Sequence, residues 1–338
     1  MAQRDRVNSG HATSVASLLF AWYRQGHRDL PWRKTSDPYR IWVSEIMLQQ
    51  TRAQAVIPYY ERFLERFPSA DALAQSSEED VLAVWSGLGY YSRARNLRRG
   101  AHLVQAAGGF PREYDAIKKL PGVGDYTAAA IASIAFGLPH AVADGNVFRV
   151  VARVENDAAD IGAPRTRERF RAVAQGWLDP RDPGAFNQAL MELGATVCLV
   201  KNPLCLLCPL TEWCRARAEG TAEQLPVKLR RVEPVRIDST VLVVCRRGRV
   251  LLRQREASAR RMAGFWELPT PDELPGARVG NAIGTFRHTI THHRYTFEVV
   301  TAAVKRPGGP FRWFQPAEVT RIPLSTTARK ALEMAGVL

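Results

Sequence analysis

Four of the five cysteines lie close together, about two thirds of the way along the chain. Cys198, Cys205, Cys208 and Cys214 follow the spacing C-x6-C-x2-C-x5-C. Four thiolates at this spacing can enclose one compact metal centre. Structural zinc usually takes two C-x2-C-type pairs, whereas a cubane iron–sulfur cluster accepts uneven spacing because its corners point in different directions. The spacing therefore favours a 4Fe-4S cluster, with zinc as the alternative.

A glutamate is embedded in an apolar helical segment that Asp37 and Pro38 are expected to start. In IWVSEIMLQQT, residues 41–51, apolar side chains occupy nearly the whole circumference of the helix around Glu45. A carboxyl in such a setting is desolvated, so its pKa rises and it can act as a general acid near neutral pH. A surface glutamate paired with a base is the ordinary alternative, but no basic residue lies three or four positions away.

A glycine-rich turn separates two helical segments in EYDAIKKLPGVGDYTAAAIASIAFG. The turn contains Gly122, Val123 and Gly124, and the glycines let backbone amides crowd together at the positive end of the second helix. Both effects create an anion site suited to a phosphate. The segment resembles a helix–hairpin–helix element, and an ordinary turn between two helices is the alternative.

Asp144 follows the second of these helices, in AVADGNVFRV. We expect it to cap the next helix, and this structural role is compatible with a chemical one. Removing a base from a sugar passes through an oxocarbenium-like cation, which an ionised carboxylate stabilises. Glu45 and Asp144, one buried and one at a polar helix start, therefore fit cleavage of an N-glycosidic bond.

The composition bounds the class of protein and its partners. The chain has 338 residues, 46% hydrophobic and 24% charged, which predicts a soluble globular protein of two domains. It has no apolar run typical of a membrane span or signal peptide, which predicts an intracellular protein, cytoplasmic and nucleoid-associated in a bacterium or nuclear in a eukaryote. The net charge is +14, and from residue 222 onward 20 Lys and Arg face 10 Asp and Glu. This favours a polyanionic partner, although solubility or an Arg-rich genome would also explain it.

Two kinds of periodicity predict the elements that position these residues. Helical spacing recurs through the first two thirds of the chain, and 222–236 reads as a linker with two prolines and clustered charge. Residues 239–255 predict two strands joined at Arg247-Gly248, with Cys245 in a buried strand, and 295–304 and 324–338 predict a further strand and a closing helix. We therefore expect a multidomain fold: an all-α domain over 1–221, the linker, and an α+β domain on a mixed or antiparallel sheet over 237–338.

Two family resemblances add to this reading. The cysteine spacing looks like that of the endonuclease III superfamily of DNA glycosylases, in which it holds a 4Fe-4S cluster. The stretch 28–51, RDLPWRKTSDPYRIWVSEIMLQQT, is similar to the adenine DNA glycosylase, or MutY, family. The resemblance implies removal of adenine mispaired with 8-oxoguanine, or with guanine, from double-stranded DNA, after the base is extruded from the stack.

The MutY resemblance also implies roles for individual residues. Glu45 matches the general acid that protonates adenine N7, Asp144 the aspartate that stabilises the sugar cation, and Asn146 a residue that orients this chemistry. Positions lining the pocket of the flipped base match Arg28, Leu30, Trp32 and Glu192, although Leu30 and Trp32 alone would read as core residues. Gln50, with Thr51 beside it, and Tyr90 match residues that probe the opened duplex around 8-oxoguanine.

Tyr126 distinguishes two kinds of glycosylase. In bifunctional relatives such as endonuclease III, the position two after the last hairpin glycine is a lysine that attacks the sugar as a Schiff base. A phenol cannot form an imine, so Tyr126 predicts a monofunctional enzyme.

RMAGFWELP, residues 261–269, resembles the segment that precedes the signature helix of Nudix hydrolases. The following TPDELPGARVGNAIG lacks the paired glutamates that would hold magnesium, so we expect no pyrophosphatase activity. In the MutY family such a Nudix-like domain reads 8-oxoguanine, often through a Phe-Ser-His motif. The matching place here holds Ile290-Thr291-His292, which keeps a hydroxyl at Thr291 and an imidazole at His292 but loses an aromatic ring. Ordinary surface histidines are the alternative.

Three functions would each explain at least some of these features. An adenine-specific monofunctional glycosylase, acting by default as a monomer, accounts for all of them. A bifunctional glycosylase and lyase for pyrimidine lesions conflicts with Tyr126 and with the added domain. A non-catalytic DNA-binding iron–sulfur protein would retain the hairpin but would have no use for the acids at Glu45 and Asp144.

Overall fold

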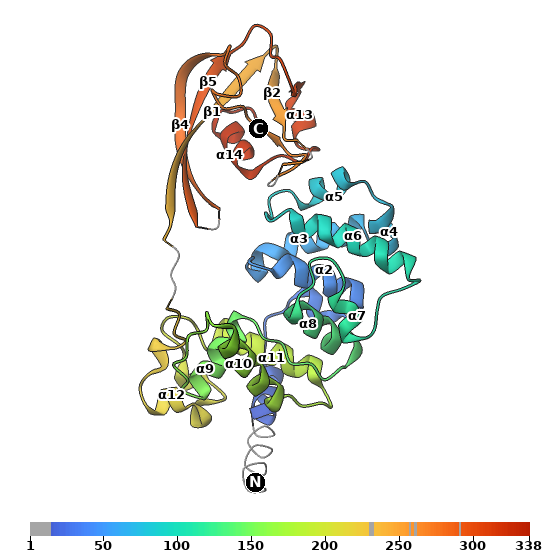
Figure 1. The fold of residues 1–338 in the computed structure, drawn as a ribbon, viewed down its shortest axis with the longest axis vertical. Coiled ribbons are helices and arrows are strands. Elements are labelled where there is room, and N and C mark those ends of the chain that lie inside the picture. The colour runs from blue at the N-terminus through green and yellow to red at the C-terminus, as the bar shows by residue number, and fades with distance from the viewer. Residues whose placement is uncertain (1–14, 230–232, 257, 260–261, 291) are drawn as a thin grey trace. The chain divides into compact units, whose positions relative to one another are not determined.

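A computed structural model describes residues 15–229, 233–256, 258–259, 262–290 and 292–338 (Figure 1). The chain forms two compact units, Met1–Ala74 with Asn96–Arg231, and Gln75–Arg95 with Val232–Leu338. The second unit includes Gln75–Arg95 because, for example, the rings of Tyr91 and Phe265 lie 4.0 Å apart. The predicted domain boundaries at 221 and 237 stay a prediction. In the described residues no helix is both long and apolar enough to cross a membrane.

The described residues of the first unit form helices joined by loops, with no strand among them, as the helical spacing predicts. Residues 15–25 form the first of these helices. It is followed by α2 (Pro38–Leu48), α3 (Ala53–Arg66), α4 (Ala70–Gln75), α6 (Ser92–Ala106), α7 (Tyr114–Lys118), α8 (Asp125–Phe136), α9 (Gly145–Val154), α10 (Pro164–Trp177), α11 (Pro183–Thr196) and α12 (Arg215–Ala218), of which α4 and α6 extend into the second unit.

Short polar side chains fix where three of these helices begin. Asp37 accepts a hydrogen bond from Arg40 N at the start of α2, and Asp144 accepts one from Val147 N at the start of α9. Asp182 accepts one from Ala185 N at the start of α11. Each contact satisfies a backbone donor that the helix itself leaves unpaired. The expected caps of α2 and α9 are therefore present.

Helix α8 is the centre of the first unit. Its sequence is nearly all small or apolar, and residues from Thr127 to Ser133 are buried. It contacts α2, α7 and α11, and α11 in turn contacts α9. Alanine side chains let neighbouring backbones approach closely, so three helices can converge on α8. This convergence brings together the residues described below.

The second unit is a mixed α+β structure. It contains β1 (Val235–Arg246), β2 (Arg249–Gln254), β3 (Trp266–Glu267), β4 (Arg278–Ile290), β5 (His293–Ala303) and β6 (Phe311–Phe314), with α5 (Glu78–Trp85), α13 (Pro316–Val319) and α14 (Thr326–Met334). The described strands form a sheet of order β3-β2-β1-β5-β4, and β6 pairs with β2. Strands β1 and β5 are parallel and the other pairs are antiparallel, which confirms a mixed sheet. The turn at Arg247-Gly248, with φ of 50° and 70°, joins β1 to β2 as predicted.

One prediction for this unit is wrong. Cys245 lies in a strand, but its side chain is exposed. The buried part of β1 runs from Val241 to Val244 and ends one residue before Cys245, near the hairpin turn. The apolar run VLVV therefore marks the core, and the cysteine that follows it does not belong to it.

Candidate active site

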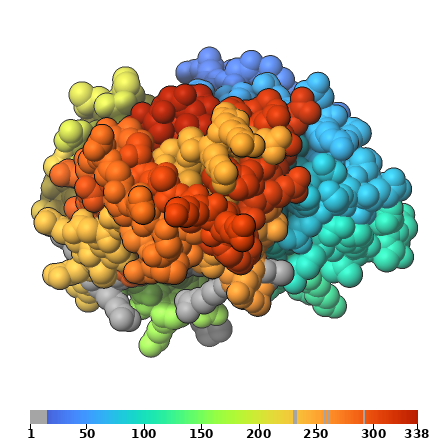
Figure 2. Space-filling model, turned by 90° about the horizontal axis from the view of Figure 1, so that it is seen from above, coloured from blue at the N-terminus to red at the C-terminus, as the bar shows by residue number. Residues whose placement is uncertain are grey.

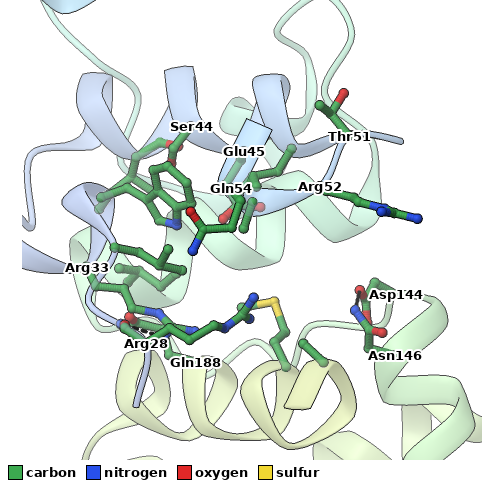
Figure 3. A pocket seen from close by; sticks show the side chains of 18 of the residues that line it. Arg28, Arg33, Ser44, Glu45, Thr51, Arg52, Gln54, Asp144, Asn146 and Gln188 are labelled. Atoms are coloured by element: carbon green, nitrogen blue, oxygen red, sulfur yellow. Dashed lines mark hydrogen bonds between the residues drawn. The ribbon is translucent and has the colours of Figure 1, made fainter. Parts of the chain in front are cut away.

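A cavity of about 610 Å3 lies among α2, α8, α9 and α11 in the first unit (Figure 3). Its lining includes Arg28, Leu30, Trp32, Arg33, Ser44, Glu45, Thr51, Arg52, Gln54, Tyr126, Asp144, Asn146, Gln188 and Met191. In Figure 3 Arg28 and Arg33 lie on the left, Asp144 and Asn146 on the right, and Glu45 between them on α2. The fold thus gathers charged groups from distant parts of the sequence around one hollow.

Glu45 is a buried acid that faces this cavity. Its residue is only 4% exposed, and its Oε2 has no hydrogen-bond partner among the described residues. Burial raises the pKa of Glu45 to about 7, with a further increase from the charge of Asp144, while the Tyr126 hydroxyl and Arg33 act in the opposite direction. A carboxyl with this pKa carries a proton in a substantial fraction of molecules at neutral pH and can donate it.

Asp144 is held in a different way. Its Oδ1 accepts a hydrogen bond from Val147 N at 2.8 Å, and its Oδ2 accepts one from Asn146 Nδ2 at 2.9 Å. Burial raises the pKa of Asp144, and these hydrogen bonds, together with Arg149, lower it. Both oxygens are therefore supplied with donors that stabilise the charged form, in contrast to Glu45.

Tyr126 reaches the cavity from the first turn of α8. Its hydroxyl lies 3.2 Å from Met191 Sδ and interacts with the carboxyl of Glu45. Burial, together with the charges of Glu45 and Asp144, raises the pKa of Tyr126 well above its ordinary value. The side chain is therefore a neutral phenol at physiological pH and can donate a hydrogen bond to Glu45.

Two arginines anchor a buried glutamate at the other end of the cavity. Arg28 contacts Glu192 through Nε at 2.9 Å and Nη2 at 2.6 Å, and Arg33 donates to the same carboxylate at 2.7 Å. Burial alone would raise the pKa of Glu192, but the hydrogen bonds from Arg28 and Arg33 hold it at about 2. Glu192 is not among the residues that line the cavity, so its carboxylate acts by fixing the arginines.

Sequence reasoning did not identify Arg33, Arg52, Gln54, Gln188 or Met191, all of which line the cavity. Arg33 stands in the RDLPWRK run that was singled out, so its proximity to Arg28 was the available signal. The other four carry no motif. Leu30 and Trp32 are both buried and line the cavity, so the core and pocket interpretations hold together.

Gln50 and Tyr90 are not among the lining residues. Each adopts a left-handed backbone conformation, with φ of 57° at Gln50 and 50° at Tyr90. Gln50 is exposed, and Tyr90, which belongs to the second unit, is 41% exposed. Such conformations are unfavourable for residues other than glycine and concentrate at functional positions. Thr51, next to Gln50, does line the cavity.

The glycine-rich turn leaves two amides available. The N–H groups of Gly122 and Gly124 have no hydrogen-bond partner in the part of the chain that the structure describes, whereas Val123 N donates to Leu120 O at 3.1 Å. Gly122 has a φ of 78°, and a Cβ there would come within 2.8 Å of the Asn96 side chain. The geometry therefore suits an anion at the two glycine amides, with Val123 in a structural role.

The four clustered cysteines line one small cavity between α9 and α12. Burial, together with Cys198, Cys205 and Cys214, raises the pKa of Cys208 to about 12, although a hydrogen bond from Leu210 N lowers it. Among the described residues no three His, Cys, Asp or Glu side chains are close enough to hold a single metal ion. Four thiols that line one cavity supply an all-sulfur set of donors, which both an iron–sulfur cluster and structural zinc accept.

Helix α9 connects the cysteine loop to the cavity. Arg149 donates to Cys198 O at 2.7 Å, to Gly194 O at 2.6 Å and to Asn146 Oδ1 at 2.8 Å. A Cβ at Gly194 would lie 2.7 Å from the Cβ of Asn146, so the close approach of α11 to α9 requires glycine. The position of Asn146, and through it that of Asp144, therefore depends on this packing.

In the second unit, the hairpin between β4 and β5 carries the Ile290-Thr291-His292 sequence. Ile290 pairs with His293 across the turn, and His292 is exposed. The ring centroids of His292 and His293 lie 4.0 Å apart. Thr291 lies outside the described residues. An exposed hairpin tip of this kind is accessible to a large ligand.

Comparisons with known proteins agree with this architecture. Residues 43–175 match the HhH-GPD superfamily of base excision DNA repair proteins, and residues 240–334 match the NUDIX domain. A solved thermostable thymine-DNA glycosylase is similar with a TM-score of 0.54 and 28% identity, over 60% of this chain and 95% of that one.

Two curated relatives are similar over nearly the whole chain. The human adenine DNA glycosylase is 34% identical over 407 residues, which span 95% of this chain and 74% of the relative. The mouse adenine DNA glycosylase is 35% identical over 404 residues, which span 95% of this chain and 78% of the relative. With an HhH-GPD domain, a Nudix-fold domain and this similarity, the chain belongs to the adenine DNA glycosylase (MutY) family, whose members are DNA N-glycosylases that remove adenine in base-excision repair.

Proposed function

We propose that this enzyme hydrolyses the N-glycosidic bond of adenine mispaired with 8-oxoguanine, or with guanine, in duplex DNA, acting as a monomer and without strand cleavage. The observation that carries the proposal is the pair of carboxyls on one cavity. Glu45 has a pKa of about 7 and an unpartnered oxygen, while both oxygens of Asp144 accept hydrogen bonds. One is suited to donate a proton and the other to remain charged.

The reaction consumes one water and yields free adenine and an abasic site. Glu45 protonates adenine N7, so the base leaves as a neutral molecule while the bond to C1′ breaks. Asp144 stabilises the positive charge that develops on the sugar, and Asn146 holds Asp144 in place through its 2.9 Å hydrogen bond. Water then attacks C1′ and forms the sugar hydroxyl, and the proton that it loses restores the protonated form of Glu45. Tyr126 cannot form a Schiff base with the sugar, so the abasic strand stays intact.

The adenine enters the cavity only after it leaves the helical stack, since the bond is unreachable within a duplex. We propose that Arg28, Leu30 and Trp32 contact the extruded base, with Glu192 orienting Arg28. Gln50, Thr51 and Tyr90 would contact the opened duplex, and the amides of Gly122 and Gly124 a phosphate.

A panel of duplexes tests the proposal. Single-turnover reactions on adenine opposite 8-oxoguanine, guanine or thymine, each followed by treatment with or without alkali, should show strand breaks only after alkali and only with the first two. Breaks without alkali would contradict the monofunctional assignment, and release of a pyrimidine would contradict the substrate.

The rate of base release should depend on the protonation of both acids. Because burial raises the pKa of Glu45 to about 7, the fraction of molecules with a proton to donate falls as the pH rises through this value. At the acid end, protonation of Asp144 removes the charge that stabilises the sugar. We therefore expect a bell-shaped profile of the single-turnover rate constant, with its basic limb near pH 7. A rate that rises steadily above pH 7 would contradict Glu45 as the donor.

The cysteine quartet is proposed to hold a 4Fe-4S cluster through Cys198, Cys205, Cys208 and Cys214. When bound, the cluster would fix the fold of this loop and contribute no step to base release. The purified protein should contain iron and acid-labile sulfide in equal amounts, measured by elemental and colorimetric analysis. Zinc at one ion per chain, with no iron, would contradict the assignment.

The Nudix-fold domain is proposed to recognise 8-oxoguanine through Thr291 and His292 on the hairpin between β4 and β5. The motif lacks the aromatic residue that family members often carry, so contacts to the oxidised purine rest on a hydroxyl and an imidazole. Removing residues 222–338 should reduce the preference for 8-oxoguanine over guanine opposite adenine. Single-turnover rates on the two duplexes measure this preference, and equal loss on both would mean that the domain supplies general affinity only.

A further inference from the structure

A hollow over strands β1, β4 and β5 of the second unit is lined by three arginines. Its volume is about 290 Å3. The lining consists of Arg236 from β1, Arg287 and Thr289 from β4, and Arg294, Tyr295 and Thr296 from β5. Arg236, Arg287 and Arg294 are exposed and are called the arginine patch below. The part of this unit from residue 233 onward appears in gold, orange and red in Figure 2.

Strand pairing brings the three guanidinium groups together. Arg236 lies directly opposite Arg294 in the parallel pair of β1 and β5. Arg294 lies opposite Thr289 on its other side, and Arg287 lies opposite Thr296, two residues further along β5. Like charges on directly paired residues repel each other and destabilise a sheet. An anion bound among the three guanidinium groups would relieve this repulsion.

Among the residues that the structure describes, no acidic side chain pairs with the arginine patch. Within the described residues no guanidinium group of the patch has an ion pair or a hydrogen bond. Other arginines of the same unit are neutralised, as Arg253 is by Glu273. The acids on these strands, Asp238 and Glu298, line a neighbouring hollow, which shares Thr296 with this one. The arginine patch is thus a cluster of three exposed cations that no described side chain neutralises in an ion pair.

The patch lies close to the turn of the hairpin that carries the proposed 8-oxoguanine contacts. Thr289 directly precedes Ile290, and Arg294 follows His293 at the other side of the turn. A guanidinium presents a planar fork of donors that matches the oxygens of a phosphate. If a base of a nucleic acid contacts the hairpin tip, the sugar–phosphate backbone next to that base lies close to the adjoining ends of β4 and β5.

We propose that Arg236, Arg287 and Arg294 bind the phosphate backbone of the DNA strand that carries the 8-oxoguanine. The proposal rests on the proposed function of the Nudix-fold domain and adds the surface that holds the strand beside the hairpin. A bound phosphate would lie among the three positive charges and reduce their mutual repulsion. Each arginine–phosphate contact would also release counterions that are condensed on the DNA, which favours binding.

The salt dependence of DNA affinity tests the proposal in the full-length protein. The duplex contains 8-oxoguanine opposite a non-hydrolysable adenine analogue, and the affinity is measured over a range of salt concentrations. Each neutralised phosphate contributes about 0.9 to the slope of log K against log salt, so three contribute about 2.7. The variant R236Q/R287Q/R294Q should lose about this much of the slope, and R236K/R287K/R294K should retain most of it.

The control variant R249Q/R278Q/R306Q removes the same charge from the same domain. These arginines lie at the other end of the sheet, where Arg278 pairs with Ala303, and they are exposed. Its slope should stay close to that of the unmodified protein. Equal slopes for the two glutamine variants would overturn the proposal, and so would a lysine variant that loses as much as the glutamine variant.

The proposed function can fail independently of the patch. If the unmodified protein bound duplexes with 8-oxoguanine and with guanine equally well, this would contradict recognition of 8-oxoguanine by the Nudix-fold domain. The difference in slope between the two glutamine variants would still test the arginine patch. Conversely, a strong preference for 8-oxoguanine with no difference in slope would contradict the patch alone.

Discussion

Glu45→Gln should bind the mispaired duplex with nearly unchanged affinity and release adenine about 10² to 10⁴ times more slowly, the range that a general acid contributes. The amide has the size and shape of the carboxyl but no proton to donate at neutral pH. Binding is preserved because Glu45 is buried and the contacts to the duplex lie on other residues. Single-turnover kinetics on adenine opposite 8-oxoguanine measure the rate, and titration with a non-hydrolysable duplex measures the affinity.

Stability provides an independent readout of the same variant. The pKa of Glu45 in the folded protein, about 7, lies above the ordinary glutamate value of 4.5. The folded state therefore binds more protons than the unfolded state between these values, and stability falls as the pH rises through this window. The difference corresponds to about 3 kcal/mol above pH 7. The glutamine has no charge to desolvate, so this variant should melt at a higher temperature than the unmodified protein at pH 8.

Glu61→Gln is the matched control for this experiment. This substitution makes the same chemical change on the exposed surface of α3, and Glu61 does not line the cavity. Its rate and melting temperature should follow those of the unmodified protein at each pH. If Glu45→Gln released adenine as fast as this control, Glu45 would be removed from the mechanism.

The sequence was sufficient to predict the burial of Glu45 and the capping role of Asp144, because both properties depend on residues nearby in the chain. An apolar helix without a base one turn away buries its glutamate, and the structure shows this for Glu45. A helix cap by an aspartate depends only on the three residues that follow it, and Asp144 accepts a hydrogen bond from Val147 N. Sequence patterns of this range predict both burial and capping, but they do not show that α2 and α9 face one cavity.

The network around Glu192 could not be predicted in this way. Arg28 and Glu192 are 164 positions apart in the chain, and their contact depends on the packing of α11. No periodicity links them, so only the family resemblance placed them in one pocket. Arg33, which shares the same carboxylate, was missed for the same reason.

The strand β4 shows a different limit. Its pairing with β5 has register shifts between Val279 and Ala282 and between Ala282 and Gly284. Such irregularities break the alternation of exposed and buried residues from which a strand is recognised. The segment therefore carried no strand signal in the sequence, although it forms one side of the hairpin and contributes Arg287 to the arginine patch.

Asp144→Asn should lower the rate of base release about 10² to 10³-fold, the usual effect of removing one group that stabilises transition-state charge. Asparagine and aspartate cap helices about equally well, so the hydrogen bond to Val147 N and the start of α9 should be retained. Burial already raises the pKa of Asp144, so a neutral side chain removes a desolvation cost as well as a charge. The melting temperature should therefore not fall, while the rate does.

Asp182→Asn separates the charge at the sugar from the cap. Asp182 begins α11 as Asp144 begins α9, accepting a hydrogen bond from Ala185 N at 3.1 Å, but it is exposed and does not line the cavity. Both variants make the same change at the same helical position, so any general effect of losing a cap charge appears in both. We expect only Asp144→Asn to slow adenine release. Equal, small effects of the two would mean that Asp144 is a helix cap and nothing more, and the sugar cation would need another counter-charge.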